Sequence, residues 1–215
     1  GQGADVTALA LYNSFDSHGW LDALPVETRD ALKLARGDIR DPQQMAALCQ
    51  RQDVVFHLAA LIGIPHSYEA PSSYVATNVQ GTVNVLTAAR DAGVSRVVHT
   101  STSEVYGTAQ FTPITEEHPL ATGPEQNEYG LNKWLCEKHL FEAHRDRGFP
   151  ASVVAFSMVF GPRNILPDRE QRMFIRLLKG RPVMIPGDGT TVGQVGHVED
   201  EARALSMMMQ NSRTF

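Results

Sequence analysis

Two short segments of the chain carry side chains that can move a proton. Residues 97–107 form an apolar run that ends in hydroxyls and one carboxylate, in the order Ser101-Thr102-Ser103-Glu104. The second segment carries Tyr129 and Lys133, four residues apart. On a helix this spacing puts both side chains on one face. Because a lysine ammonium favours the ionised form of a neighbouring phenol, we expect Lys133 to lower the pKa of Tyr129.

A phenolate and a hydroxyl that share one substrate proton can interconvert an alcohol and a ketone. Each feature has a simpler reading when it is taken alone. A Tyr-x-x-x-Lys pair is common on helix surfaces, and serines or threonines after a strand often only form turns. The two features together, in this order, predict a catalytic site.

This combination resembles the active site of the extended short-chain dehydrogenase/reductase family, which contains sugar-nucleotide epimerases, dehydratases and decarboxylases. Thr102-Ser103-Glu104 is most similar to sugar-nucleotide 4,6-dehydratases of the GDP-mannose type. Residues 11–15 (Leu-Tyr-Asn-Ser-Phe) and 57–62 (His-Leu-Ala-Ala-Leu-Ile) are similar to dehydratases of bacterial legionaminic-type acid pathways. The resemblance covers nearly the whole chain.

Composition narrows the class of protein. The chain has 215 residues, 42% of them hydrophobic, which is enough for one sizeable core. Its net charge is −5 and it has no basic run, so we expect neither nucleic acid nor a membrane surface as a partner. Cys49 and Cys136 lack the spacing of metal ligands, so we expect no metal site and a reducing, cytoplasmic setting.

Runs of strand length alternate with segments of helical periodicity. The predicted strands cover residues 5–11, 34–41 with a turn, 53–60, 95–100 and 151–156. The predicted helices cover residues 22–32, 42–51, 71–92, 128–147, 171–179 and a segment that starts at 197. This order predicts an α/β protein with a Rossmann-like, doubly wound parallel sheet, whose ligands bind at the carboxyl ends of the strands.

Local signals refine some of these elements. Asp41 is expected to cap the helix that Pro42 begins. Apolar residues at helical spacing are candidates for the core. They are Val75, Val79, Val83 and Leu86 on one helix, and Leu131, Leu135 and Leu140 on another.

The amino-terminal Gly1-Gln2-Gly3-Ala4 is not a phosphate-binding loop, because the dinucleotide fingerprint needs a preceding strand, a third glycine and a following helix. We therefore expect the sheet to lack its first strand and glycine loop. The resemblance also implies that much of the C-terminal substrate domain is missing. On this view residues 1–156 form an incomplete dinucleotide-binding domain, and residues 157–215 form part of a substrate-binding region.

The resemblance implies NAD or NADP as cofactor. Residues 10–14 hold neither an acid for the ribose hydroxyl nor an arginine for a 2′-phosphate, so the preference stays open. Simpler roles are open for some of the residues that the resemblance implies. Asp38 could equally form a turn, and Ala59 and Ala60 could simply pack tightly. Asn78 either braces the active site or lies at the polar edge of the apolar face of its helix. The implied cofactor-binding residues are Asp38, Ile39, Leu58, Ala59, Ala60, Asn78, Ser101, Tyr129 and Lys133.

The implied activity is that of a sugar-nucleotide 4,6-dehydratase. Tyr129 takes the proton of the C4 hydroxyl while Thr102 binds the same oxygen. Glu104 removes the C5 proton and also serves the leaving hydroxyl, because Ser103 stands where some dehydratases carry an aspartate. The implied substrate-binding residues are His66, Ser67, Thr102, Ser103 and Arg163.

Other functions stay open at this point. Ala155 and Met158 stand where the family often has an arginine and an asparagine, which weakens any assignment of the substrate. A UDP-glucuronate decarboxylase or a C4 epimerase would share the Tyr/Lys pair. The alternative outside the enzymes is a non-catalytic nucleotide-binding or scaffold protein. The resemblance also implies a homodimer that forms through residues 71–92 and 128–147.

Overall fold

The computed structural model describes residues 3–121, 126–162, 164, 170–185, 187–190 and 193–209. The strands are β1 (Val6–Leu11), β2 (Leu32–Gly37), β3 (Val54–His57), β4 (Arg96–Thr102), β5 (Ala151–Phe156), β6 (Met158–Phe160) and β7 (Val195–His197). The α-helices are α1 (Val26–Asp30), α2 (Pro42–Cys49), α3 (Ile64–Glu69), α4 (Pro71–Tyr74), α5 (Gly81–Asp91), α6 (Glu128–Arg147), α7 (Glu170–Leu178) and α8 (Val198–Met208). Two 3₁₀ turns, η1 (Gly19–Ala23) and η3 (Ser103–Tyr106), and the π-helical η2 (Val75–Gln80) complete the elements.

All paired strands in the described part of the chain are parallel, in the orders β1-β2, β3-β4-β5 and β6-β7. Parallel neighbours need a crossover connection, and helices supply it here. The predicted α/β fold with a parallel, Rossmann-like sheet is confirmed. The β1-β2 pair and the β3-β4-β5 group share no ladder hydrogen bonds, so β1 and β3 each keep one unpaired edge among the described strands.

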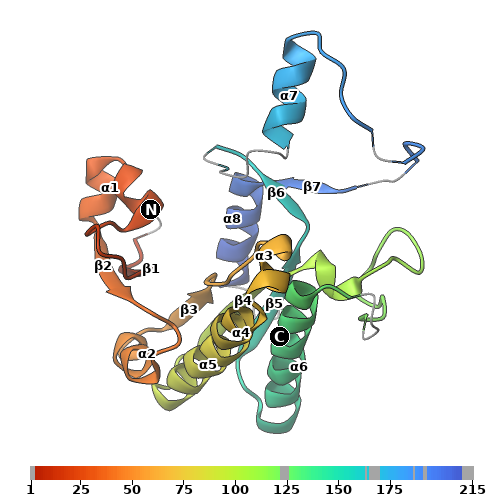
Figure 1. Cartoon of the computed structure of the whole chain (residues 1–215). Helices are drawn as coiled ribbons and strands as arrows, with labels where there is room; N and C mark the ends of the chain where they lie inside the picture. Colours follow the sequence, from red (N-terminus) through yellow and green to blue (C-terminus); the bar gives the residue numbers. More distant parts are fainter. Residues whose placement is uncertain are drawn as a thin grey trace.

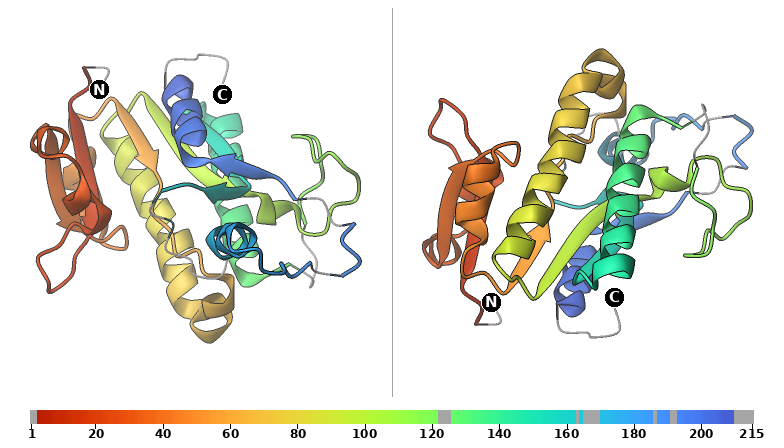
Figure 2. Two further views of the ribbon diagram at one scale, coloured as in Figure 1. Left: turned by 90° about the horizontal axis from the view of Figure 1, so that it is seen from above. Right: turned by 90° about the horizontal axis from the view of Figure 1, so that it is seen from below.

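Helices cover both faces of the strands (Figure 1). Figure 2 shows α5 and α6 side by side on one face, with α8 on the opposite side of the strands. The guanidinium of Arg96 ties α8 to β4 through a 2.5 Å hydrogen bond to the Met208 carbonyl. No helix in the described residues is both long enough and apolar enough to cross a bilayer.

The core lies between the strands and the helices α2, α5 and α6. Val97 and Val98 of β4 are completely buried, as a central parallel strand requires. Ile39 packs so closely on Gly81 that a Cβ there would lie 2.5 Å from the isoleucine Cδ1. The main cluster contains Ile39, Met45, Cys49, Val85, Leu86, Ala88, Ala89, Val94, Val97, Leu140, Ala143, Phe149 and Ala151.

Several predicted elements are confirmed at the residue level. The strand over 151–156 and the helix over 128–147 have the predicted bounds. Asp41 caps α2 by accepting hydrogen bonds from the backbone amides of Gln43 and Gln44, at 2.9 and 3.2 Å. The long helix over 71–92 is present as the continuous run α4, η2 and α5, and its middle is π-helical.

One predicted helix and some of the predicted core residues were wrong. Residues 22–32 do not form one helix, because the chain is extended at Leu24 before Pro25, and Leu32 already begins β2. Leu131 and Leu135 are 36% and 40% exposed, so of the predicted leucines on α6 only Leu140 belongs to the core. The reason is that α6 buries a face of polar side chains instead. Val75, predicted for the core, is likewise half exposed.

Asn84 fastens α5 to the loop after β2, because its amide donates hydrogen bonds of 3.0 Å to the carbonyls of both Ile39 and Arg40. We expect Asn84→Ala to lower the free energy of unfolding by about 1–3 kcal/mol, since it strips two carbonyls of their partner. Urea unfolding measures this loss. Thr87→Ala, an exposed change on the same helix, is the control; equal losses for the two variants would contradict the assignment.

Candidate active site

The carboxyl end of β4 runs directly into the turn η3. The Thr102 hydroxyl caps this turn by accepting a 3.3 Å hydrogen bond from the backbone amide of Glu104. Thr102 is 9% exposed, whereas Ser103 and Glu104 are half-buried. The strand end therefore presents a hydroxyl and a carboxylate next to each other, as the sequence predicts.

Asn127 ties the Glu104 carboxylate to the start of α6. Its side-chain oxygen caps the helix by accepting from the Gly130 amide at 2.7 Å, while its amide nitrogen donates to Glu104 Oε2 at 2.7 Å. Gly130 allows this approach, because a Cβ at that position would lie 2.8 Å from the Glu104 carbonyl oxygen. One residue thus fixes both the helix terminus and the direction of the carboxylate.

Tyr129 and Lys133 lie on the buried face of α6, as their spacing predicts. The Lys133 ammonium is 3% exposed and donates a 2.8 Å hydrogen bond to the Thr100 carbonyl. Burial lowers its pKa, and the nearby Cys136 and Glu137 oppose this change. The site therefore holds a desolvated lysine directly beneath the end of β4.

Burial is the largest influence on the pKa of the Tyr129 phenol in this structure. Burial raises the pKa of Tyr129, while its interaction with the Thr102 hydroxyl works against this. The Glu104 carboxylate raises the pKa of Tyr129 further. Deprotonation of the buried phenol therefore needs positive charge near the ring.

A buried polar network lies behind α6. The Asn78 side chain bonds both the amide and the carbonyl of Leu61, at 2.8 and 2.9 Å, and so braces the segment after β3. Its own carbonyl accepts from Thr82 Oγ1 at 2.5 Å and from Cys136 Sγ at 3.1 Å. Thr82 in turn contacts His57 Nε2 at 2.8 Å. Asn78 thus holds the segment after β3 against the start of this network.

The residues predicted for a nucleotide cofactor fit such a group in part. Leu58 and Ala59 are exposed at the carboxyl end of β3, which leaves small apolar surface open to a ligand. The Asp38 carboxylate accepts hydrogen bonds from Arg40 Nε at 2.9 and 3.0 Å, and these lower its pKa. An apolar surface and an ionised carboxylate at strand ends suit the base and ribose of a dinucleotide. Ile39, however, is buried in the core, so only its backbone can contact a ligand.

The predicted substrate residues are not equally placed. His66 is exposed and lies 3.4 Å from Glu69 Oε2. Ser67 is fully buried and donates its hydroxyl to the Ile64 carbonyl at 2.6 Å, so its predicted substrate contact finds no support. Arg163 lies outside the described residues. Ser101, predicted to bind the cofactor, is 5% exposed.

Sequence reasoning missed Asn127 and Glu137. An asparagine just before a helix signals a cap, so Asn127 could have been found as such, but its second bond to Glu104 depends on the tertiary fold. Glu137 continues the spacing of Tyr129 and Lys133 by another four residues, which marks it as a member of the same face.

Comparisons with known proteins show which family the chain resembles. The sequence model of the NAD dependent epimerase/dehydratase family matches residues 1–215. The chain is 34% identical to a dTDP-glucose 4,6-dehydratase from Actinoplanes sp., over 97% of this chain and 64% of that protein. It is 32% identical to the low-salt glycan biosynthesis protein Agl12 from Haloferax volcanii, over 97% of this chain and 69% of that protein.

A solved structure has a similar fold. The structure of DesIV, a dTDP-glucose 4,6-dehydratase from Streptomyces venezuelae with NAD and TYD bound, matches with a TM-score of 0.81 at 28% identity. The match covers 99% of this chain and 65% of that chain. The chain thus spans about two thirds of the length of these relatives.

The double role of Asn127 can be separated by mutation. We expect Asn127→Ala to lower the free energy of unfolding by about 1–2 kcal/mol, since it loses the cap and leaves Glu104 without its donor. Asn127→Ser keeps a capping oxygen and should lose less. Urea unfolding of the two variants checks the order; a serine variant as unstable as the alanine variant would contradict the capping role.

Proposed function

Since the chain belongs to the NAD-dependent epimerase/dehydratase family, we propose that the protein is a sugar-nucleotide 4,6-dehydratase. The observation that carries this proposal is the fixed Glu104 carboxylate. A C4 epimerase needs to move only the proton of the C4 hydroxyl, which Tyr129 and Thr102 can handle. A dehydratase also needs a base for the C5 proton. Glu104 lies two residues after Thr102 and is held by Asn127 at 2.7 Å, which suits that second role.

The first step in this proposal is removal of the C4 hydroxyl proton by Tyr129. The Thr102 hydroxyl binds the same substrate oxygen and holds it in line with the phenol. Tyr129 is only 8% exposed, so the proton passes between the two groups without exchange with bulk water. The Lys133 ammonium contributes a fixed positive charge behind the reacting groups.

A bound NAD(P) would supply the chemistry of hydride transfer at C4 and a positive ring near the Tyr129 phenol. Leu58, Ala59 and Ala60 would line the binding site of this cofactor, and Asp38 would lie near its adenosine. NAD is bound in the DesIV structure, which supports this choice of cofactor. Residues 10–14 hold neither an acid nor an arginine, so this segment favours neither NAD nor NADP.

The second step is removal of the C5 proton, which a ketone at C4 makes acidic. Glu104 is the base in this step, and Asn127 directs its carboxylate. With a serine at position 103, the same carboxyl then gives a proton to the hydroxyl that leaves C6 as water. Each positioned acid or base of this kind contributes about 10²–10⁴-fold to the rate.

The division of labour along the chain follows from the same proposal. Residues 1–156 would bind the dinucleotide, and residues 157–215 would contribute to binding of the nucleotide sugar. The relatives that carry dTDP-glucose dehydratase names support a nucleotide sugar as substrate class. A protein that works on such metabolites would act in the cytoplasm.

We expect the full-length protein, incubated with UDP-, GDP- and dTDP-hexoses in D2O, to give a product lighter by one water and labelled at C5. Mass spectrometry follows both changes, and Tyr129→Phe should slow them by about 10²–10⁴-fold. Loss of carbon dioxide would favour a decarboxylase, and a product of unchanged mass a C4 epimerase. Bound cofactor without any turnover would favour a binding or scaffold protein.

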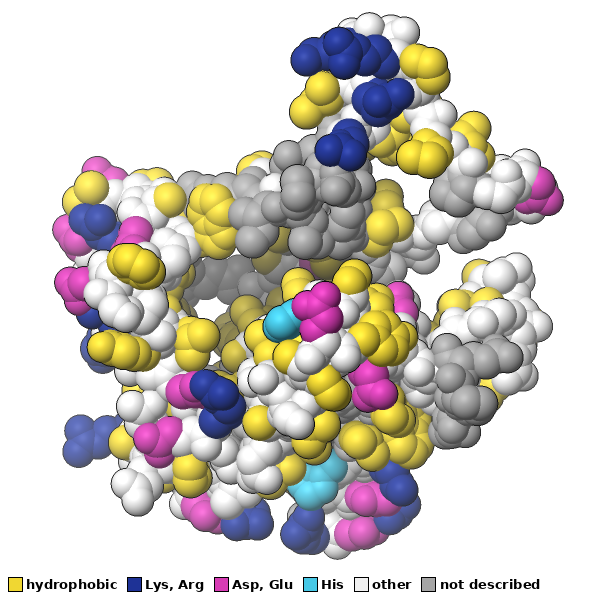
Figure 3. Space-filling model, in the orientation of Figure 1, with side chains coloured by type: hydrophobic (Ala, Val, Ile, Leu, Met, Phe, Trp, Pro, Cys, Tyr) yellow, Lys and Arg dark blue, Asp and Glu magenta, His cyan; other side chains and the backbone are white. Residues whose placement is uncertain are grey.

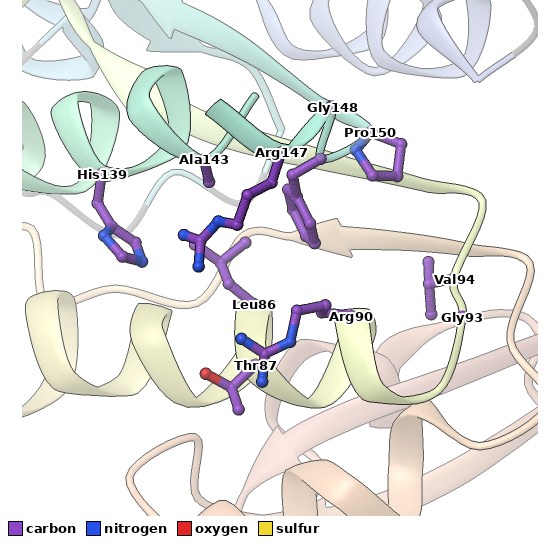
Figure 4. Close-up of a pocket in the computed structure, with 11 residues that line it drawn as sticks. Leu86, Thr87, Arg90, Gly93, Val94, His139, Ala143, Arg147, Gly148 and Pro150 are labelled. Carbon is purple, nitrogen blue, oxygen red and sulfur yellow. The ribbon is translucent and has the colours of Figure 1, made fainter. Parts of the chain in front are cut away.

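A homodimer would form through the outer faces of the two long helices. Val75, Leu131 and Leu135 are exposed there, and hydrophobic side chains gather over this part of the molecule (Figure 3). A cavity of about 300 Å³ between α5 and α6 has Arg90 and Arg147 pointing into it (Figure 4). An acidic side chain of a second copy, which carries a net charge of −5, would complement these arginines.

This dimer predicts that Leu135→Glu weakens self-association at least about tenfold, because it places a charge in an apolar contact. Sedimentation at micromolar concentration measures the monomer fraction. Leu178→Glu, which alters an exposed leucine on α7, is the control and should stay dimeric. A dimer that tolerates glutamate at position 135, or a monomeric wild type, would contradict this interface.

A further inference from the structure

Glu137 is a buried carboxylate that the proposed reaction does not use. It follows Tyr129 and Lys133 on the same face of α6, at intervals of four residues. The side chain is 4% exposed, and its Oε1 has no hydrogen-bond partner among the described residues. A buried carboxylate is costly, so its place on α6 one turn from the buried Lys133 needs a physical reason.

The buried charged side chains among the described residues explain why a carboxylate lies there. They are Arg96, Lys133 and Glu137. Arg96 is engaged with the Met208 carbonyl on the α8 side of β4, whereas Lys133 lies one turn from Glu137. Burial raises the pKa of Glu137 and lowers the pKa of Lys133, and each group opposes the shift of the other. The two charges therefore maintain each other.

The neighbouring titratable groups do not replace Glu137. Burial lowers the pKa of His57 to about 3 and that of His99 well below its usual value, so both imidazoles on β3 and β4 are neutral. Burial raises the pKa of the Cys136 thiol, which is next to Glu137 on α6. On η3, Tyr106 also has a raised pKa. None of these groups supplies a negative charge at neutral pH.

Ser101 connects Glu137 to the strand that carries the catalytic hydroxyl. Its hydroxyl is buried and acts to lower the pKa of the Glu137 carboxyl. The oxygen atoms Ser101 Oγ and Glu137 Oε1 are not within hydrogen-bond geometry of any described partner, so the contact is loose. Ser101 immediately precedes Thr102 on β4. Glu137 therefore interacts with two neighbours of the catalytic hydroxyl and phenol, namely Lys133 on α6 and Ser101 on β4.

We propose that Glu137 is a positioning residue that keeps the Lys133 ammonium charged inside the protein and thereby supports the Tyr129 phenolate. The catalytic consequence rests on the proposed function, whereas the effect on Lys133 does not. Glu137 touches neither Tyr129 nor the Glu104 turn in any described hydrogen bond, so it acts through the lysine.

The direct test is the ionisation of Lys133 in the full-length protein without substrate. Lysine labelled with carbon-13 at Cε reports the pKa of Lys133 by NMR titration, and Lys133→Arg identifies its signal. Glu137→Gln keeps the shape but removes the charge, and should lower the pKa of Lys133 by about one unit. Glu142→Gln, on the same helix, is the control and should leave it unchanged. An unchanged Lys133 pKa in Glu137→Gln would overturn the proposal.

A second readout is the pH profile of turnover. Because the phenolate is the active form, kcat/KM rises with pH through the apparent pKa of Tyr129. Glu137→Gln should move this rise to higher pH by up to about one unit, and Glu137→Asp should restore part of it. Loss of activity with an unmoved profile would indicate a merely structural role and overturn the proposal.

The two hypotheses fail separately. If no sugar nucleotide reacts but the Lys133 pKa still falls in Glu137→Gln, the proposed function is wrong and the support of Lys133 stands. If turnover occurs and neither the Lys133 pKa nor the pH profile moves, only this proposal is wrong. If Glu137→Gln does not fold, Glu137→Asp, which draws the carboxylate away from Lys133, is titrated instead and should lower the Lys133 pKa by a smaller amount; no change would overturn the proposal.

Discussion

The hydrogen bond from the Lys133 ammonium to the Thr100 carbonyl is the constraint on which the site depends. It locks α6 onto the end of β4, at 2.8 Å, inside a region closed to water. With the helix held there, Tyr129 lies against Thr102, and Asn127 at the helix start reaches Glu104. Gly130 makes the approach possible, because any side chain would collide with the turn after β4. These contacts join the strand end, the turn and the helix to one another.

Burial sets the pKa values of the ionisable groups in this region, and it also costs folding free energy. A lysine, a glutamate and two imidazoles lie in an interior that disfavours their charged forms, and both ring nitrogens of His99 lack a partner among the described residues. The π-helical turn η2 adds to this, since it places the Asn78 carbonyl where Thr82 and Cys136 can both bond it. Such local violations of ordinary folding rules are expected where a protein maintains a reactive geometry.

Local patterns predict the elements but not the environments of their side chains. The bounds of α6 and β5, the Asp41 cap and the shared face of Tyr129 and Lys133 all follow from spacing and capping, because these are short-range properties. The exposure of Leu131 and Leu135 does not, because which face of a helix is buried depends on neighbours far away in sequence. For the same reason the spacing of Tyr129 and Lys133 does not reveal that burial raises the pKa of the phenol, because the burial of the ring depends on the tertiary fold.

The account claims that Tyr129 and Glu104 act in successive steps, and one measurement separates them. Full-length Glu104→Gln and Tyr129→Phe are mixed with substrate, and the near-ultraviolet absorbance of reduced nicotinamide is followed in a stopped-flow instrument. Glu104→Gln should develop this absorbance and hold it, because oxidation at C4 proceeds while removal of the C5 proton is blocked. Tyr129→Phe should develop none on that timescale. A Glu104→Gln variant that completes turnover at the wild-type rate would contradict the account.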